Sequence, residues 1–339
     1  MRSRAKFAQS HQRRFSRWLH NSRINVHRIY SPLIAAALRN WGVAEINLIE
    51  DTTMLWDEFC LIRLSIQYRG RAVPLTWRVL RHGSSSVRFE VYQALLNRAA
   101  RLIPNGISVR FLADRGFADT QLMRYLRDDL QWHFRIRVKS NAWIYRPRKG
   151  WKQLKQYHLA AGESILLHGV SLTKSRPLAD LNVALGRDPL SAQVWLVATD
   201  EPATLQTFQQ YSERFQVEEE ILDEKSNGFQ LERSELRDVP ALSRLCMVMA
   251  VTTLLLTVQG QQVVTAGKRR WVDAHWNRGN SYFRIGWNWL KGCLHQDWLL
   301  FPTLALHGGT DPQPAIASKK QAQRQFEREF TAKSYRFAA

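Results

Sequence analysis

The sequence predicts an α/β protein whose mixed sheet contains a hairpin. Three observations support this fold class: three strand-like runs in succession between residues 45 and 80, helical and strand-like segments in alternation between 89 and 138, and the return of that alternation at residue 194. Such an order is typical of layered α/β folds. A chain of 339 residues with 45% hydrophobic residues can bury a sizeable core and is too apolar to be mainly disordered.

The charge of the chain is strongly positive. It contains 49 Lys and Arg against 29 Asp and Glu, a net charge of +20, which favours binding to a polyanion. Three cysteines are too few for a disulfide framework, so we expect a reducing compartment. The basic N-terminus is followed by no apolar stretch that would indicate a signal peptide. The apolar run Cys246–Val258 is too short to cross a bilayer and predicts a buried helix.

Residues 1–42 predict a basic, helical N-terminal region that contacts DNA. The first 40 residues contain nine Lys and Arg and no acidic residue, and apolar residues recur at helical spacing between Phe15 and Leu19. A helical apolar stripe with basic flanks suits a folded phosphate contact, whereas a solubilising basic tail is the alternative. The arginines beside this stripe are Arg13, Arg14 and Arg17.

Residues 43–139 predict the first part of the α/β core. The expected strands share runs of apolar or alternating residues, and they cover 46–51, 60–68, 72–80, 107–113 and 133–138. The expected helices cover 89–99 and 119–130. We expect Asp119 or Thr120 to cap the second of these helices.

Three further regions follow. Residues 140–192 break the rhythm with basic clusters, turn residues and short β-like runs, and they predict a β-rich insertion. Residues 193–260 predict the second part of the core, with a strand from Val194 to Ala198 and then a long helix that ends near Lys225. Asp200 is the expected cap of that helix, and Pro202 suits its first turn. Residues 261–339 form a C-terminal basic region.

Three acidic residues stand where they can converge. Asp51 and Asp114 each follow a predicted strand, and Glu218 lies on the long predicted helix. Side chains at one edge of a sheet face a common crevice, and a helix beside that edge can add a third acid. Three carboxylates held together repel one another unless cations separate them, and Mg²⁺ prefers oxygen ligands. With the positive charge, this predicts metal-dependent phosphoryl transfer on nucleic acid. Asp57 is an alternative to Asp51.

The long predicted helix carries a polar stripe. Tyr211, Arg214, Glu218 and Lys225 fall on one narrow face when each residue advances about 100°. Apolar residues flank this stripe on both sides, so Glu218 faces the apolar side of its helix. A charge in such surroundings must be paired or must hold a metal. An internal Arg214–Glu218 salt bridge, which the i,i+4 spacing permits, is the alternative explanation.

These motifs together resemble the signature of DDE transposases. The matching segments are Glu50-Asp51-Thr52-Thr53, Asp114-Arg115-Gly116-Phe117 and Tyr211-x2-Arg214-x3-Glu218-x6-Lys225. The last is similar to the YREK motif of one bacterial insertion-sequence group, the Tn5-like group. The resemblance covers roughly residues 45–260.

The resemblance implies an RNase H-like catalytic core with the β-rich insertion before the helix that carries Glu218. It implies that Asp51, Asp114 and Glu218 are catalytic and bind two Mg²⁺ or Mn²⁺ ions. Water would attack at the transposon end, and the freed 3′-OH would then attack target DNA. In this family the Tyr, Arg and Lys of the motif hold phosphates of the DNA end, which carries over to Tyr211, Arg214 and Lys225.

The resemblance also bears on partners and location. It implies double-stranded DNA as substrate, namely inverted-repeat ends and a target, and a homodimer in a synaptic complex. We expect a cytoplasmic, nucleoid-associated bacterial protein, and we add Arg115 to the predicted DNA contacts. Some relatives stack a flipped base on a tryptophan of the insertion, for which Trp143 and Trp151 are candidates, although we favour a place in the core for both.

Two other functions stay open on the sequence alone. An RNase H-like nuclease without strand transfer would carry the same acids. A catalytically inactive DNA-binding regulator would keep the charge, but the intact Asp51, Asp114 and Glu218 argue against it. RNA binding is disfavoured because the chain lacks the glycine and aromatic patterns of the common RNA-binding modules.

Overall fold

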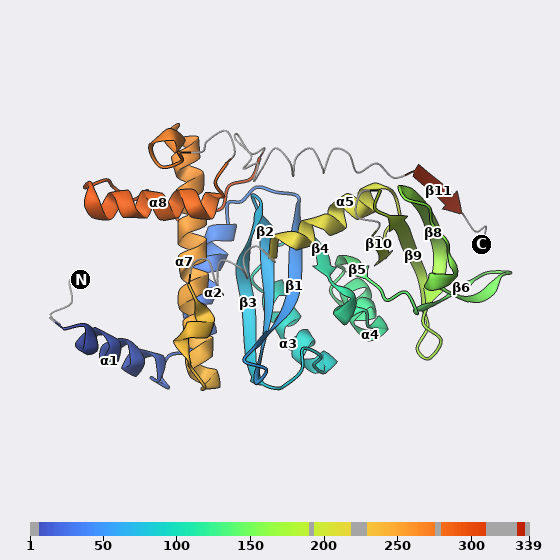
Figure 1. Cartoon of the computed structure of the whole chain (residues 1–339), viewed down its shortest axis with the longest axis horizontal. Helices are drawn as coiled ribbons and strands as arrows, with labels where there is room; N and C mark the ends of the chain where they lie inside the picture. Colours follow the sequence, from blue (N-terminus) through green and yellow to red (C-terminus); the bar gives the residue numbers. More distant parts are fainter. Residues whose placement is uncertain (1–6, 190–192, 218–228, 275–278, 310–330, 336–339) are drawn as a thin grey trace.

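A large mixed sheet organises the molecule (Figure 1). The computed structural model describes residues 7–189, 193–217, 229–274, 279–309 and 331–335. Within these residues eleven strands belong to one sheet. The strands are β1 (Glu45–Leu55), β2 (Phe59–Tyr68), β3 (Arg71–Arg81), β4 (Ser108–Ala113), β5 (His133–Arg137), β6 (Trp143–Arg146), β7 (Gly150–Gln153), β8 (Glu163–Leu172), β9 (Leu178–Arg187), β10 (Val194–Thr199) and β11 (Thr331–Tyr335).

Helices cover the sheet and one of its ends (Figure 1). The described α-helices are α1 (Ala8–Leu19), α2 (Val26–Leu38), α3 (Phe89–Ala100), α4 (Thr120–Arg124), α5 (Gln206–Ser212), α7 (Val239–Thr265) and α8 (Tyr282–His295). The predicted cap of the helix after residue 119 is confirmed, because the Asp119 side chain accepts a hydrogen bond from the backbone N–H of Gln121.

The first half of the sheet confirms the predicted fold class. Its strand order is β3-β2-β1-β4-β5. β1, β2 and β3 pair antiparallel as a meander, whereas β1, β4 and β5 run parallel. Three antiparallel strands followed by two parallel ones, with helices between the parallel strands, form an RNase H-like core.

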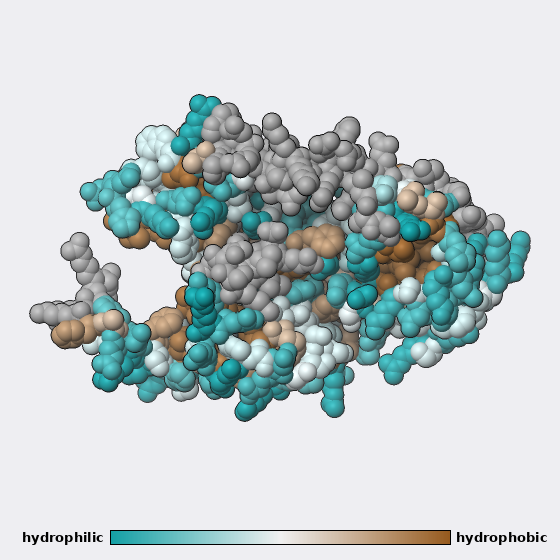
Figure 2. Space-filling model, viewed as in Figure 1, coloured by the Kyte–Doolittle hydropathy of each residue, from teal (hydrophilic) through white to brown (hydrophobic). Residues whose placement is uncertain are grey.

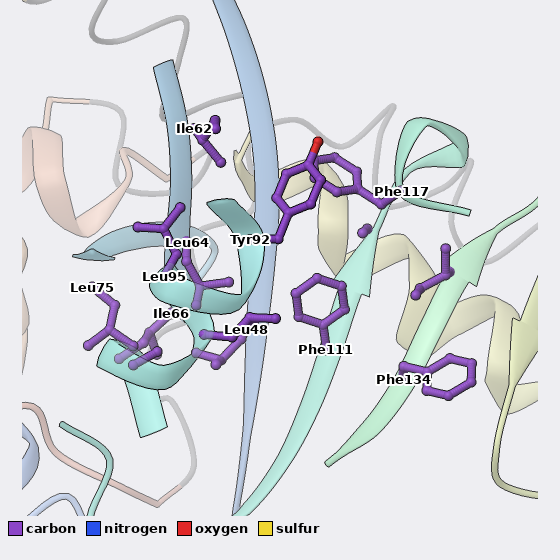
Figure 3. Close-up of a cluster of buried hydrophobic side chains, with 14 of the residues drawn as sticks. Leu48, Ile62, Leu64, Ile66, Leu75, Tyr92, Leu95, Phe111, Phe117 and Phe134 are labelled. Carbon is purple, nitrogen blue, oxygen red and sulfur yellow. The ribbon is translucent and has the colours of Figure 1, made fainter. Parts of the chain in front are cut away.

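The core lies between this sheet and α3 (Figure 3). Strand side chains alternate between the two faces, so Leu48 of β1 and Phe111 of β4 point to the same side. There they meet Leu95 of α3 within one large cluster of buried apolar residues. The opposite face of β1 is therefore the one that carries the odd-numbered residues, including Ile49 and Asp51.

The β-rich extension continues the same sheet. β10 pairs antiparallel with β5, and the order then runs β10-β9-β8-β6-β7. Trp143 lies on β6 with the Nζ atom of Lys174 3.6 Å from its ring centroid, and Trp151 lies on β7 against Tyr145. Both tryptophans are half-buried. The expected place in the core is therefore wrong for both, because they lie on the β6–β7 hairpin, at the end of the strand order among the described residues.

The helix α7 is longer than the apolar run that predicted it. It spans 27 residues, and in the described part of the chain it is the one helix long and apolar enough to suit a membrane span. Its apolar window is 67% buried inside the protein, against β3, α2 and α8. A core helix of a globular protein has the same properties.

The two long C-terminal helices cross at close range. Gly260 of α7 faces Gly286 of α8, and a Cβ atom added at Gly260 would lie 1.8 Å from the carbonyl oxygen of Tyr282. A Cβ atom at Gly286 would lie 1.8 Å from the carbonyl oxygen of Leu256. The helices therefore touch through their main chains. The surface is hollowed between α8 and α1, which both lie beside α7 (Figure 2).

Candidate active site

The pairing of β1 with β4 brings two of the predicted acids to the same level of the sheet. The strands are parallel, and the last pair in register is Glu50 opposite Ala113. Asp51 and Asp114 are the next residues on each strand. β4 ends there, whereas β1 continues to Leu55 beside β2. Asp51 therefore lies within a strand, not after one as predicted, because its Thr-rich continuation keeps the antiparallel ladder with β2.

Asp114 begins a tight turn. Its Oδ1 atom accepts a hydrogen bond of 2.7 Å from the backbone N–H of Gly116. A Cβ atom at Gly116 would lie 2.9 Å from that oxygen, so glycine is the residue that leaves room for this carboxylate orientation. Arg115 is exposed in the same turn.

The electrostatics of Asp51 link it to its neighbours. Burial raises the pKa of Asp51 to about 6, and the negative charge of Asp114 adds to the rise. The guanidinium groups of Arg214 and Arg63 act in the opposite direction, as does the Thr53 hydroxyl, which donates a hydrogen bond of 3.3 Å to Oδ2. The charge of Asp114 thus acts on the pKa of Asp51. This interaction favours Asp51 as the acid of the candidate site over Asp57, which lies in the β1–β2 turn.

Tyr211 and Arg214 lie on the same side of the sheet as these acids. Tyr211 is fully buried, with its ring against Trp195 at 5.8 Å between centroids. Burial raises the pKa of Tyr211, and Asp114 adds to this, whereas Arg214 and Arg137 oppose it. The guanidinium carbon of Arg214 lies 4.8 Å from the centroid of the Phe215 ring. Two residues of the predicted stripe therefore lie within electrostatic range of the two aspartates.

The helix that carries this stripe differs from its prediction. It begins at Gln206 and passes through a 3₁₀ turn at Glu213–Phe215 before Gln216 and Val217 are helical again, so the continuous helix expected from residue 202 starts later and is interrupted. Its expected end near Lys225 lies outside the described residues. Asp200 does not cap it. Its Oδ1 atom instead accepts a hydrogen bond from the backbone N–H of Phe134, and its Oδ2 atom lies 2.7 Å from Nδ1 of His133.

The chain after this turn returns to the face that carries Asp51. Val217 is fully buried in a small cluster with Ile49 and Leu112. Those two residues stand two positions before Asp51 and Asp114, on the same face of the sheet. Glu218 and Lys225 lie outside the described residues. Within the described residues no three His, Cys, Asp or Glu side chains gather as metal ligands.

Two charged residues near Asp51 were missed by the sequence analysis. Arg63 is 4% exposed and faces Asp51 in the β1–β2 register. Glu50 is fully buried, and neither of its carboxyl oxygens has a hydrogen-bond partner in the described part of the chain. Burial, with Asp51 as a second cause, raises the pKa of Glu50 well above its usual range. Both could have been noticed in the sequence, because each is a charged residue within an otherwise apolar strand.

The basic residues predicted at the N-terminus lie elsewhere. Arg13, Arg14 and Arg17 are exposed on α1, which packs on α7 through the buried Leu19. Figure 1 places α1 on the far side of α7 from β1 and β4. These arginines therefore form a basic surface separate from the two aspartates.

Comparisons with known proteins identify the family. A model of the transposase DDE domain matches residues 59–255, which is more than half of the chain and begins after Asp51. No curated protein gave a significant match. Among solved structures, the piggyBac transposase synaptic complex with hairpin DNA is similar at 13% identity and a TM-score of 0.44 over 87% of this chain.

This chain covers 62% of that transposase, and thus spans less than two-thirds of its length. The Argonaute of Marinitoga piezophila, solved with guide RNA and target DNA, is similar at 8% identity and a TM-score of 0.25, over 61% of this chain and 29% of that one. The family assignment rests on the family model, whose match spans strands β2 to β10 and most of α7. The chain belongs to the transposase DDE domain family.

Proposed function

We propose that this protein is a DDE transposase that cleaves DNA at transposon ends and transfers the freed strand into target DNA. The observation that carries the proposal is the arrangement of Asp51 and Asp114 at the same level of two parallel strands, in a chain of the transposase DDE domain family. Two carboxylates from neighbouring strands, set in a strongly basic protein, suit a phosphodiester substrate.

Glu218 is the third acid of the proposal. Its neighbour Val217 packs against Ile49 and Leu112 on the face that carries Asp51, which supports an approach of the chain to the two aspartates. We propose Asp51, Asp114 and Glu218 as the catalytic and metal-binding residues. Asp57 is not proposed.

The donor set suits a hard divalent cation. Asp51 is half-buried, its pKa is raised by burial and by Asp114, and both side chains offer oxygen atoms. Two Mg²⁺ or Mn²⁺ ions held by the three acids would activate a water and stabilise the leaving oxygen. The protein's own task is to hold Asp51 on β1 and Asp114 in the turn after β4, with Asp51 ionised above about pH 6.

Arg214 has two tasks in this proposal. Its guanidinium opposes the rise of the Asp51 pKa, and so it favours the ionised carboxylate. With Tyr211 and Lys225 it would also hold phosphates of the DNA end, for which a planar guanidinium is well shaped. This assignment follows the resemblance to the YREK motif of the bacterial insertion-sequence group.

The partners follow from the same proposal. The substrates are double-stranded inverted-repeat ends and a target duplex, and the active form is a homodimer in a synaptic complex. Arg115 and the α1 residues Arg13, Arg14 and Arg17 are exposed and would contact DNA phosphates. Such an enzyme would act in the bacterial cytoplasm, at the nucleoid.

The decisive experiment uses Asp114→Asn, with DNA that carries the inverted repeats flanking the gene. We expect Mg²⁺-dependent cleavage to be lost and DNA affinity to stay within about twofold. Arg81→Ala, at an exposed surface ion pair with Glu58, is the control that should cleave normally. Cleavage retained in Asp114→Asn would remove Asp114 from the metal site.

A plasmid-joining assay separates the other functions. Wild-type protein that cuts ends but never joins a 3′-OH to a target plasmid would be a nuclease. Wild-type protein that binds ends without cutting them, with Mg²⁺ or Mn²⁺ present, would be a DNA-binding regulator.

A further inference from the structure

A cavity of about 360 Å³ opens between α3, β3, the start of α7 and the segment that joins α1 to α2. Arg78 of β3, Arg98 of α3 and Arg244 of α7 line it, and we call it the arginine pocket. It lies on the α3 side of the sheet, whereas Asp51 faces the opposite side with Ile49 and Val217. The arginine pocket is therefore separate from the candidate active site.

The floor of the arginine pocket is rigid. The Trp77 side chain is 1% exposed, and its Nε1–H donates to the carbonyl oxygen of Ser243 at 3.2 Å. The His27 ring lies 5.1 Å from the Trp77 ring, between centroids. Arg244 is fixed as well, since its Nη1 donates to the carbonyl oxygen of Leu19 at 2.6 Å. A ligand would thus meet preformed walls.

The charges around the arginine pocket are all of one sign. None of the residues that line it is acidic. The nearest acid along the chain, Asp238, uses its Oδ2 atom to cap α7 by accepting from the N–H of Ala241 at 2.8 Å. In the described part of the chain, no ion pair or hydrogen bond is formed by the side chain of Arg78 or Arg98.

Burial and the neighbouring cations lower the pKa values of Arg98 and His27. Burial lowers the pKa of Arg98, and the charges of Arg101 and Arg78 lower it further. Burial and the charge of Arg98 lower the pKa of His27 to about 4, so His27 is neutral at physiological pH. The half-buried Arg98, beside the like charge of Arg78, costs free energy, and an anion in the pocket would relieve that cost.

We propose that the arginine pocket binds a phosphate group, supplied by the backbone of a DNA strand that passes over β3 and α3 away from the scissile bond. This inference rests on the proposed function for its DNA. A guanidinium offers a planar pair of donors that matches two phosphate oxygens. Arg78 is exposed and Arg98 is half-buried, so the pocket is open to a strand on the surface.

The neighbouring surface supports a strand as the source of the phosphate. The segment at the pocket follows directly after α1, and Arg244 ties that segment down through the carbonyl oxygens of Leu19 and Ile24. The exposed arginines of α1 therefore lie on the same rigid unit as the arginine pocket. A DNA duplex that contacts α1 could therefore place a phosphate in the arginine pocket, which lies next to the end of α1.

The test has two arms, each with full-length wild type, Arg98→Ala and the exposed Arg78→Ala. In the first arm, thermal unfolding is followed in inorganic phosphate and in sodium chloride of equal ionic strength. Phosphate should raise the unfolding midpoint of wild type above that in chloride, and both variants should lose this difference.

In the second arm, the affinity for duplex DNA is measured against salt without metal. Each variant should bind about tenfold more weakly, and the slope of log K against log salt should be smaller by about 0.9, the value for one phosphate contact. Arg81→Ala, which removes an exposed β3 cation paired with Glu58, is the matched control and should keep the wild-type slope.

The outcomes separate the sources of phosphate. Loss of the phosphate effect together with a smaller DNA slope supports the proposal. A phosphate effect lost in the variants with an unchanged DNA slope would overturn the DNA strand as the ligand and leave a free anion. No phosphate effect in wild type and no change of slope would overturn the site itself. Cleavage by Asp114→Asn is measured separately, so a failure of the proposed function would be visible on its own.

Discussion

Glu50 and Asp51 are consecutive residues of β1, and their carboxyl groups face opposite sides of the sheet. Asp51 lies within electrostatic range of Asp114, Arg214 and Arg63, whereas Glu50 is one of the groups that raise the pKa of Tyr92 on α3. One strand thus presents an acid to the candidate active site and another to the apolar core. The two acids have different consequences for stability.

Glu50→Gln should make the protein more stable at neutral pH. The folded-state pKa of Glu50 is raised, so its contribution to stability is full below about pH 4.5 and is lost as pH rises. Wild type should lose up to about 1.4 kcal/mol per pH unit from this group, whereas glutamine needs no proton. Urea unfolding between pH 4.5 and 8 should show an advantage of the variant that grows with pH. Parallel profiles would mean that Glu50 stays ionised.

Mg²⁺ should stabilise the protein more as pH rises through about 6. Asp51 has a raised folded-state pKa, so without metal its favourable contribution is present below about pH 4 and is lost as pH rises through about 6. Metal binds the ionised carboxylate and competes with the proton. The unfolding midpoint with and without Mg²⁺ should differ little at pH 5 and clearly at pH 8, and Asp51→Asn should abolish the difference.

Gly116→Ala should impair cleavage without unfolding the protein. The new Cβ atom would lie 2.9 Å from Oδ1 of Asp114, and the carboxylate can rotate away. A displacement of about 1 Å in a catalytic group can cost about 100-fold in rate. Gly83→Ala is the matched control, because its Cβ atom would make an ordinary contact of 3.4 Å. Equal cleavage rates for the two variants would show that the Asp114 orientation is unimportant.

Lys225→Ala should weaken binding to the DNA end and lower the salt slope by about one unit, as the loss of one phosphate contact predicts. Lys291→Ala, on the exposed side of α8, removes the same charge and should leave the slope unchanged. Fluorescence anisotropy across a salt series measures both. An unchanged slope in Lys225→Ala would exclude a phosphate contact by this lysine.

Gly260→Ala should destabilise the protein by about 3 kcal/mol, because its Cβ atom would overlap the main chain of α8. Gly292→Ala also creates an overlap, but with the ring of Trp298, a side chain that can move. Its loss of stability should therefore be smaller. Chemical unfolding of both variants measures the difference, and a reversed order would contradict a main-chain contact at the crossing.

Local patterns predicted much of this structure. Alternation and apolar runs located the strands of the core, and an aspartate before a helical segment predicted the cap at Asp119. The position of Asp51 and Asp114 at the same level of the sheet was also predictable, because the apolar segments that precede them pair as parallel strands. Each of these features depends on residues close together in the sequence or on a general rule of sheet geometry.

The features that the sequence analysis missed depend on distant partners. Asp200 has the local signature of a cap, but its partners, the N–H of Phe134 and Nδ1 of His133, lie 66 and 67 positions away. The burial of Glu50 and the convergence of Arg78, Arg98 and Arg244 likewise come from the packing of separate elements. Spacing along the chain carries no information on such encounters.

The crossing of α7 and α8 has a mechanical consequence. Side chains at a helix contact can absorb a small movement by changing rotamer. Two main chains in direct contact have no rotamers to change, so the helices move together. If a bound partner displaced α8, the 27-residue helix α7 would move with it. The displacement would then reach β3, against which α7 packs. The contact at Gly260 and Gly286 thus couples α8 to the sheet through α7.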